Sequence, residues 1–286
     1  MKVLSGDNFC EVSKYRLYRT VYEIVHPTIS KKNISNYKVL FDDKLLPVLV
    51  YYPQKVSNIN SVIIYVPGDG LISGSYGKYE KICKKMAVET NSLVIAVDYF
   101  NGTIKYPTIV NKIYKLIKFL YDQFETIGIC KEKITLMGDS TGCIILSNLV
   151  SKMISKNLFA SKMVLFYPVV RYDYSDYCWN ETYLNININL DKKINNYLKK
   201  YFSKSKEQGC SLLERDNLLG FPKTLVLTAE MDILKEDGSI LASKFINNIE
   251  GSKYCNIKFA NHGFLSCADE EIQRELYNEL NNFLIH

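Results

Sequence analysis

The amino-acid sequence predicts an α/β fold, with a mostly parallel eight-stranded sheet and helices on both faces. Short runs rich in Val, Ile, Leu and Tyr alternate with longer segments in which apolar residues recur three and four positions apart. This alternation is typical of parallel sheets, because each parallel connection needs a crossover that is usually a helix. The chain has 286 residues and is 47% hydrophobic, which is enough to form a large core.

Eight runs have the composition of strands. The first two flank Asp42–Asp43 and predict a hairpin. The third ends in Pro67-Gly68-Asp69-Gly70, where a buried strand would give way to a loop. In chain order, the predicted strands are Tyr37–Phe41, Pro47–Tyr52, Ser61–Val66, Leu93–Val97, Ile134–Gly138, Met163–Tyr167, Thr224–Thr228 and Cys255–Phe259.

Helices are predicted between and after these strands. One begins after the start signal Pro107-Thr108 and carries an apolar stripe from Ile109 to Leu120. The segment Cys143–Ile154 is apolar nearly all round, which predicts a helix packed in the middle of the structure. Apolar spacing predicts two more helices, around Leu241–Ile246 and Ile272–Leu284.

Two stretches, 1–36 and 171–221, fall outside this alternation. The second contains an apolar stripe surrounded by lysines, which consists of Ile194, Tyr197, Leu198, Tyr201 and Phe202. An ordinary amphipathic helix with a solvated basic face would explain this pattern, and so would a cap over an active site. Because we find no internal repeat and no low-complexity linker, we predict a single domain, 1–286, with cap elements from about 1–36 and 171–221.

The charge, the length of apolar runs and the cysteine content limit the classes of protein to which this chain could belong. The net charge is +6, and the lysines are spread among acids and asparagines, whereas a nucleic-acid binder would gather them on one face. No apolar run is long enough to cross a bilayer, and Met1–Thr20 lacks the features of a signal peptide. The eight cysteines contain no Cys-x-x-Cys pair and give no metal-ligand spacing with the three histidines. We therefore expect a soluble cytoplasmic protein with reduced thiols, no metal and no nucleic-acid partner.

The segment Gly138-Asp139-Ser140-Thr141-Gly142 fits the Gly-x-Ser-x-Gly pattern of a nucleophile elbow. In such an elbow the serine lies on a tight, strained turn between a strand and a helix. Both glycines are needed because a Cβ two residues either side of the serine would collide with neighbouring backbone. The pattern alone is a weak signal, but here a predicted strand precedes it and a predicted helix follows directly. This context predicts Ser140 as a nucleophile.

A serine hydroxyl needs a base to accept its proton, and the chain offers His26, His262 and His286. His262 follows the last predicted strand, which places it at the carboxyl edge of the sheet together with the elbow, where sites in open α/β sheets gather. His26 precedes a proline outside the alternating region, and His286 is the terminal residue. These placements favour His262 as the base.

The acid that orients the imidazole is predicted to be Asp232, which comes just beyond the strand Thr224–Thr228. Glu230 and Asp237 are nearby rivals. Glu230 falls too close to the strand end, and Asp237 opens the next helix, where acids are favoured by the helix dipole. The chain order serine, aspartate, histidine is the order found in hydrolases built on a nucleophile elbow.

Together these residues resemble the hormone-sensitive-lipase-like esterases, a family of the α/β-hydrolase fold. The resemblance covers roughly residues 47–285, in the correct order. The family's elbow is Gly-Asp-Ser-Ala-Gly, from which this chain departs at Thr141. The other matching motifs are Val97-Asp98-Tyr99, Tyr167-Pro168, Ala229-Glu230-Met231-Asp232-Ile233-Leu234 and His262-Gly263-Phe264.

The resemblance implies hydrolysis of small carboxylic esters with short to medium acyl groups, through an acyl-enzyme and without a cofactor. It also implies an oxyanion hole made by backbone N–H groups of Asp69, Gly70 and Thr141. The family's His-Gly-Gly-Gly loop reads Pro67-Gly68-Asp69-Gly70 here. Since a carboxylate beside a developing oxyanion would oppose it unless turned away or paired, Asp69 bears on rate and substrate preference.

Two other functions stay open at this point. One is a non-catalytic small-molecule receptor on the same fold, against which the complete set of serine, histidine and aspartate argues. The other is a hydrolase of amides, peptides or thioesters, because the same residues serve these reactions and specificity resides in the cap and the acyl pocket. Whether the chain forms a homodimer is also left open.

Overall fold

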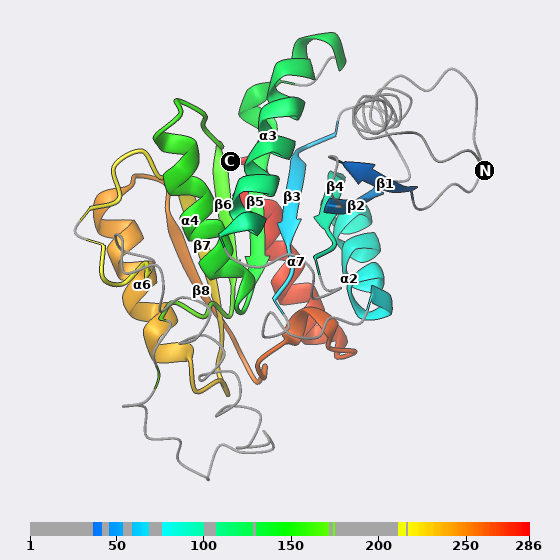
Figure 1. Ribbon diagram of the computed structural model, residues 1–286. Coiled ribbons are helices and arrows are strands. Elements are labelled where there is room, and N and C mark those ends of the chain that lie inside the picture. Colours follow the sequence, from blue (N-terminus) through cyan, green and yellow to red (C-terminus); the bar gives the residue numbers. More distant parts are fainter. Residues whose placement is uncertain are drawn as a thin grey trace.

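The computed structural model describes residues 37–41, 46–53, 59–68, 76–99, 107–127, 130–171, 174, 211–215 and 217–286. Within these ranges the chain forms an eight-stranded sheet with helices on both faces (Figure 1). The strand order is β1-β2-β4-β3-β5-β6-β7-β8. The pairs β1–β2 and β2–β4 are antiparallel, and all other neighbours are parallel. The predicted mostly parallel sheet and the predicted hairpin are therefore confirmed.

The strand boundaries agree with the sequence prediction to within two residues. The strands are β1 (Tyr37–Phe41), β2 (Leu46–Tyr51), β3 (Val62–Val66), β4 (Leu93–Val97), β5 (Ile134–Asp139), β6 (Lys162–Phe166), β7 (Lys223–Ala229) and β8 (Lys253–Ile257). The largest difference is at β8, which the sequence predicted at Cys255–Phe259. Phe259 has a φ of 56° and is 78% exposed, so it cannot continue a strand, whereas Lys253 pairs with Leu225 of β7.

The described helices are α2 (Tyr76–Glu89), α3 (Thr108–Ile127), α4 (Gly142–Ile154), α6 (Lys235–Asn248) and α7 (Glu270–Ile285), with short 3₁₀ turns at Lys131–Lys133 and Phe264–Ser266. Four of these helices match the predicted segments. The fifth, α2, was not among them. Its buried side is formed by Tyr79, Ile82, Cys83, Met86 and Ala87, and lysines between these residues dilute the helical pattern.

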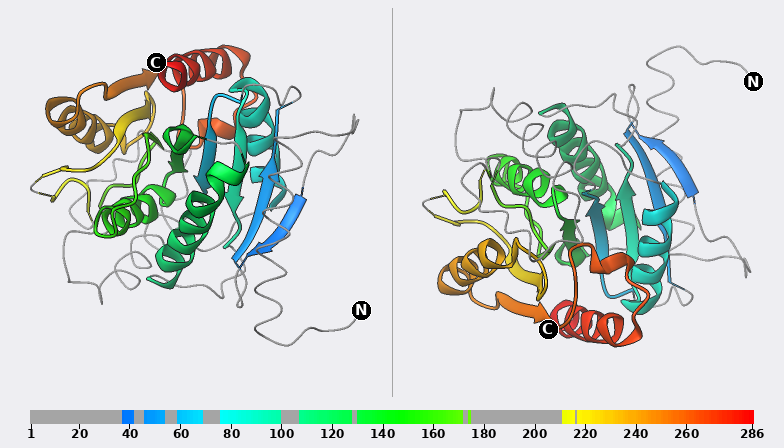
Figure 2. Two further views of the ribbon diagram at one scale, coloured as in Figure 1. Left: turned by 90° about the horizontal axis from the view of Figure 1, so that it is seen from above. Right: turned by 90° about the horizontal axis from the view of Figure 1, so that it is seen from below.

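Each face of the sheet has its own core. Apolar residues of α3, α4 and α6 pack with one set of alternating strand residues, and those of α2 and α7 pack with the other set. Figure 2 shows these two groups of helices on opposite faces of the sheet. The helix α4 follows β5, which lies between β3 and β6 in the middle of the sheet. Because α4 packs centrally, its residues are buried nearly all round, as the sequence predicted.

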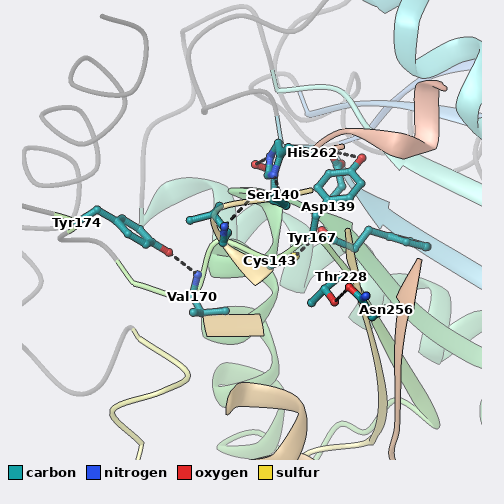
Figure 3. Close-up of polar contacts among 12 residues, drawn as sticks. Asp139, Ser140, Cys143, Tyr167, Val170, Tyr174, Thr228, Asn256 and His262 are labelled. Carbon is teal, nitrogen blue, oxygen red and sulfur yellow. Dashed lines mark hydrogen bonds and ion pairs between the residues drawn. The ribbon is translucent and has the colours of Figure 1, made fainter. Parts of the chain in front are cut away.

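The two ends of the predicted cap segment 171–221 lie together. The Ser211 hydroxyl donates to the carbonyl oxygen of Val170 at 2.8 Å, and the Tyr174 hydroxyl accepts from the Val170 N–H at 3.1 Å (Figure 3). The Arg171 guanidinium makes two hydrogen bonds, at 2.9 and 2.8 Å, to the buried carboxylate of Asp237 in the first turn of α6. The remainder of this segment, its apolar stripe and residues 1–36 lie outside the described residues, so the cap stays a prediction.

None of the cysteines that the structure describes forms a disulfide. Cys83 and Cys143 are buried, and Cys130 is exposed. Within the described ranges, no helix is both long enough and apolar enough to cross a membrane.

Replacement of Phe245 on α6 tests the core on the face of the sheet that α3, α4 and α6 cover. Its side chain is fully buried and contacts Phe221, with ring centroids 6.1 Å apart. We expect Phe245→Ala to lower the free energy of unfolding by about 3–5 kcal/mol, because it removes buried apolar surface and leaves a cavity. Phe159→Ala is the matched control, since Phe159 is 53% exposed and should change stability by less than about 0.5 kcal/mol. Urea unfolding measures both, and equal midpoints for the two variants would contradict this packing.

Candidate active site

Ser140 lies on the turn between β5 and α4. Its φ is 49°, a left-handed conformation that costs a non-glycine residue about 1–2 kcal/mol. Two backbone hydrogen bonds to the end of β6 and the segment after it hold Ser140 there: the Ser140 N–H donates to the Phe166 oxygen at 3.0 Å, and the Val169 N–H donates to the Ser140 oxygen at 3.1 Å. The turn thus presents the serine side chain beyond the carboxyl end of the central strand.

The glycines on either side permit close packing of the turn. A Cβ built at Gly142 would lie 2.2 Å from the carbonyl oxygen of Val66, at the end of β3. A Cβ at Gly138 would lie 2.7 Å from Cδ1 of Leu146 and 3.2 Å from the same Val66 oxygen. The predicted collision with neighbouring backbone is therefore confirmed at Gly142, whereas at Gly138 the closest contact is with the end of the Leu146 side chain and the backbone contact is only tight.

The side chains of Ser140, His262 and Asp232 form a continuous line of contacts, of which Figure 3 shows Ser140 and His262. His262 Nε2 lies 3.0 Å from the Ser140 Oγ, and His262 Nδ1 lies 2.7 Å from Asp232 Oδ2. The three residues come from the turns that follow β5, β7 and β8. Because parallel strands end at the same edge of the sheet, residues more than a hundred positions apart meet there.

The surroundings of Asp232 fix its orientation. Its side chain is only 2% exposed, and its second oxygen accepts the Leu234 N–H at 3.0 Å. The carboxylate held against Nδ1 favours the tautomer with its proton on Nδ1, in which Nε2 is an acceptor for the Ser140 hydroxyl. This arrangement can draw the proton from Ser140 and hold the resulting imidazolium.

Both rival acids are engaged elsewhere. Glu230 Oε2 accepts the Phe259 N–H at 2.8 Å, and Asp237 pairs with Arg171. Of the other two histidines, His26 lies outside the described residues, and His286 is exposed just beyond the end of α7.

The predicted oxyanion donors are only partly within the described residues. Thr141 is buried and precedes the first turn of α4, with its backbone N–H next to Ser140. Asp69 and Gly70 lie outside the described residues. The start of their loop is fixed, because the Tyr99 hydroxyl donates to the Pro67 oxygen and the Gly68 N–H donates to Asp139 Oδ1 at 2.9 Å.

Sequence reasoning missed the surroundings of Asp139. This carboxylate is 4% exposed and lies against the hydroxyl groups of Tyr65, Tyr79 and Tyr167. Burial, reinforced by the charge of Asp139, raises the pKa of Tyr65 and of Tyr167, so both phenols remain protonated at neutral pH. The position of Asp139 beside the nucleophile was the one available signal, since the tyrosines are distant in sequence.

Cys143 is a further nucleophilic group near the elbow, but its chemistry is different. Burial raises the pKa of its thiol, and the thiol donates to the Gly138 oxygen at 3.2 Å. A protonated, buried thiol is a poor nucleophile. Among the residues that the structure describes, no three His, Cys, Asp or Glu side chains gather in a way that could hold a metal ion.

Comparison with known proteins agrees with the fold and the order of these elements. A family model described as alpha/beta hydrolase fold matches residues 63–266, which is more than half of the chain. An arylesterase of Saccharolobus solfataricus is 26% identical over 266 residues, covering 87% of this chain and 84% of that protein.

Two solved structures extend the likeness to the whole fold. An esterase of the archaeon Pyrobaculum calidifontis has a TM-score of 0.75 at 21% identity, covering 99% of this chain and 93% of the other. A thermostable carboxylesterase cloned from a metagenomic library has a TM-score of 0.73 at 25% identity, covering 95% and 96%.

The family match runs from β3 to the 3₁₀ turn that follows His262, and so it includes every element that carries the site. The resemblance inferred from the motifs is thereby confirmed. The chain belongs to the α/β-hydrolase fold family, as a carboxylesterase-type member that resembles the hormone-sensitive-lipase-like enzymes.

Proposed function

We propose that this protein hydrolyses carboxylic esters, with Ser140 as nucleophile, His262 as general base and acid, and Asp232 as the residue that orients His262. The observation that carries this proposal is the line of two contacts, 3.0 Å from Ser140 Oγ to His262 Nε2 and 2.7 Å from Nδ1 to Asp232. Each distance is within the range of a hydrogen bond that can move or hold a proton.

The reaction proceeds in two acyl-transfer steps. Ser140 Oγ attacks the ester carbonyl carbon while His262 Nε2 takes the serine proton, and the carbonyl oxygen becomes an oxyanion. The oxyanion collapses, the bond to the alcohol breaks, and His262 gives its proton to the leaving alcohol. Water then attacks the acyl-enzyme in the same manner and releases the carboxylic acid, which restores Ser140.

The developing oxyanion is stabilised by backbone donors. Thr141 supplies one N–H beside the first turn of α4, where the helix dipole also favours negative charge. Asp69 and Gly70 are proposed to supply the others from the loop after β3. The Asp69 carboxylate has to turn away from the oxyanion or be paired, because a second negative charge there would slow the reaction.

The proposed substrates are small esters with short to medium acyl groups. The names of the similar proteins, an arylesterase and a thermostable carboxylesterase, support ester chemistry. A receptor that only binds its ligand would have no use for an aligned base and acid, so the contacts of His262 favour catalysis. The cytoplasmic location is proposed from the sequence alone, and whether the chain forms a homodimer is left open.

Ser140→Ala tests the nucleophile directly. We expect hydrolysis of p-nitrophenyl butyrate to fall by at least about 10³-fold, because the attacking oxygen is removed while the fold is kept. Ser147→Ala is the matched control: this hydroxyl is also on the β5–α4 unit, is buried, and has no hydrogen-bond partner among the described residues. The control should retain the wild-type rate, and a Ser140→Ala protein with more than a tenth of wild-type kcat would contradict the proposal.

Asp232→Asn tests the orienting acid with an almost isosteric change. We expect kcat to fall by about 10⁴-fold, because the amide disfavours the tautomer with a proton on Nδ1 and does not stabilise the imidazolium. Glu230→Gln is the control, since a glutamine oxygen can still accept the Phe259 N–H, and its kcat should stay within about threefold of wild type. If the two variants lost activity equally, the assignment of the acid would be wrong.

A further inference from the structure

A second buried carboxylate lies beside the candidate triad and has no part in the steps above. Asp139 Oδ1 accepts from the Tyr65 hydroxyl at 2.6 Å and from the Gly68 N–H at 2.9 Å. Its Oδ2 lies 3.3 Å from the Tyr79 hydroxyl and 3.4 Å from the Tyr167 hydroxyl. Since an ionised carboxylate only accepts hydrogen bonds, the phenols act as donors toward it. Asp139 therefore anchors three tyrosines that come from β3, α2 and the end of β6.

One of these tyrosines continues to the catalytic base. The ring of Tyr167 lies 4.8 Å from the ring of His262, centroid to centroid, at an interplanar angle of 59° (Figure 3). The same ring meets Phe264 edge-on at 4.8 Å. Tyr167 thus has its hydroxyl on Asp139 and its ring against the imidazole, and it is almost completely buried.

The backbone at Tyr167 is held in a strained form that fixes this placement. Its φ is 35°, outside the region that most residues adopt, and its N–H donates to the Leu227 oxygen at 2.7 Å. Strain of this kind persists only where surrounding contacts maintain it, and it is concentrated at functional sites.

We propose that Tyr167 is a positioning residue, anchored by Asp139, whose ring orients the His262 imidazole and stabilises its charged form during acyl transfer. This inference rests on the proposed function, because it requires His262 to become an imidazolium. The negative face of an aromatic ring attracts a cation within about 6 Å of the ring centre. The centroid distance of 4.8 Å lies within this range, and the tilt of 59° allows an edge of the imidazolium to meet that face.

The other groups around His262 act in defined ways. Among the described residues, Asp232 contacts Nδ1, Ser140 contacts Nε2, and Phe264 is apolar, while the Asp139 carboxylate accepts the Tyr167 hydroxyl. Glu230 is bound to the backbone of Phe259 on the same loop. Replacement of Tyr167 should accordingly change the stability of the charged form of His262, and with it the pKa of His262, while both triad contacts stay in place.

The test is the pH dependence of kcat/KM for p-nitrophenyl butyrate in wild type, Tyr167→Leu and Tyr79→Phe. Loss of the ring destabilises the imidazolium, so His262 releases its proton more readily. The midpoint of the acidic limb should therefore move to lower pH by about 0.4–1.5 pH units. On the plateau, kcat should fall by about 3- to 30-fold with little change in KM. Tyr79→Phe removes a hydroxyl from the same Asp139 oxygen and should leave the midpoint in place.

A second series remains informative if Tyr167→Leu fails to fold. Phenylalanine and a trifluorinated phenylalanine at position 167 both keep an aromatic ring there, but fluorine withdraws electron density and reduces the negative potential of the ring face. The midpoint should move to lower pH on fluorination, and an unchanged or raised midpoint would overturn the proposal. A wild-type protein without esterase activity would instead refute the proposed function, so the two failures are distinguishable.

Discussion

The backbone of the β5–α4 turn lies in direct contact with the end of β3, and the placement of every other group in the site depends on that contact. A side chain at Gly142 would come within 2.2 Å of the Val66 oxygen, so the turn approaches β3 as closely as a backbone can. From this position the Ser140 backbone makes hydrogen bonds to Phe166 at the end of β6 and to Val169, and the Gly68 N–H donates to Asp139. The positions of Ser140 and of the start of the loop proposed to supply oxyanion donors are therefore set by the same packing.

The strain at Ser140 is small compared with the interactions that oppose it. A left-handed serine costs about 1–2 kcal/mol, whereas each of its two backbone hydrogen bonds contributes about 1 kcal/mol. The apolar cores on the two faces of the sheet add far more, because each fully buried Leu, Ile or Val contributes about 1.5–3 kcal/mol. A rigid central sheet can thus hold several unfavourable conformations at its carboxyl edge, at Ser140, Tyr167 and Phe259.

Much of this arrangement was predictable from the sequence. The alternation of strand and helix patterns predicted the sheet, and β1 and β4 match their predicted bounds. Ser140, Asp232 and His262 were each predicted from their place after a strand, and the structure brings their side chains together. This succeeds because the end of a parallel strand can be located from local pattern alone, and all such ends share one edge.

What the sequence missed depends on contacts between distant residues. The lysines of α2 weaken its apolar stripe, although Tyr79 and Cys83 face the core. The cluster around Asp139 joins residues from 28 to 74 positions away, and no period or motif signals that three tyrosine hydroxyls meet there. The ion pair between Arg171 and Asp237 is of the same kind, since a helix-opening acid gave no sign of a partner 66 residues away.

The central claim is that Ser140 is activated as a nucleophile by His262. Reaction of the folded protein with a fluorophosphonate, followed by mass-spectrometric mapping of the modified peptide, tests it most directly. A single adduct on Ser140 that forms in wild type and is lost in His262→Ala is the predicted result. Folded wild-type protein that stays unmodified, or that carries its adduct on another residue, would contradict the claim.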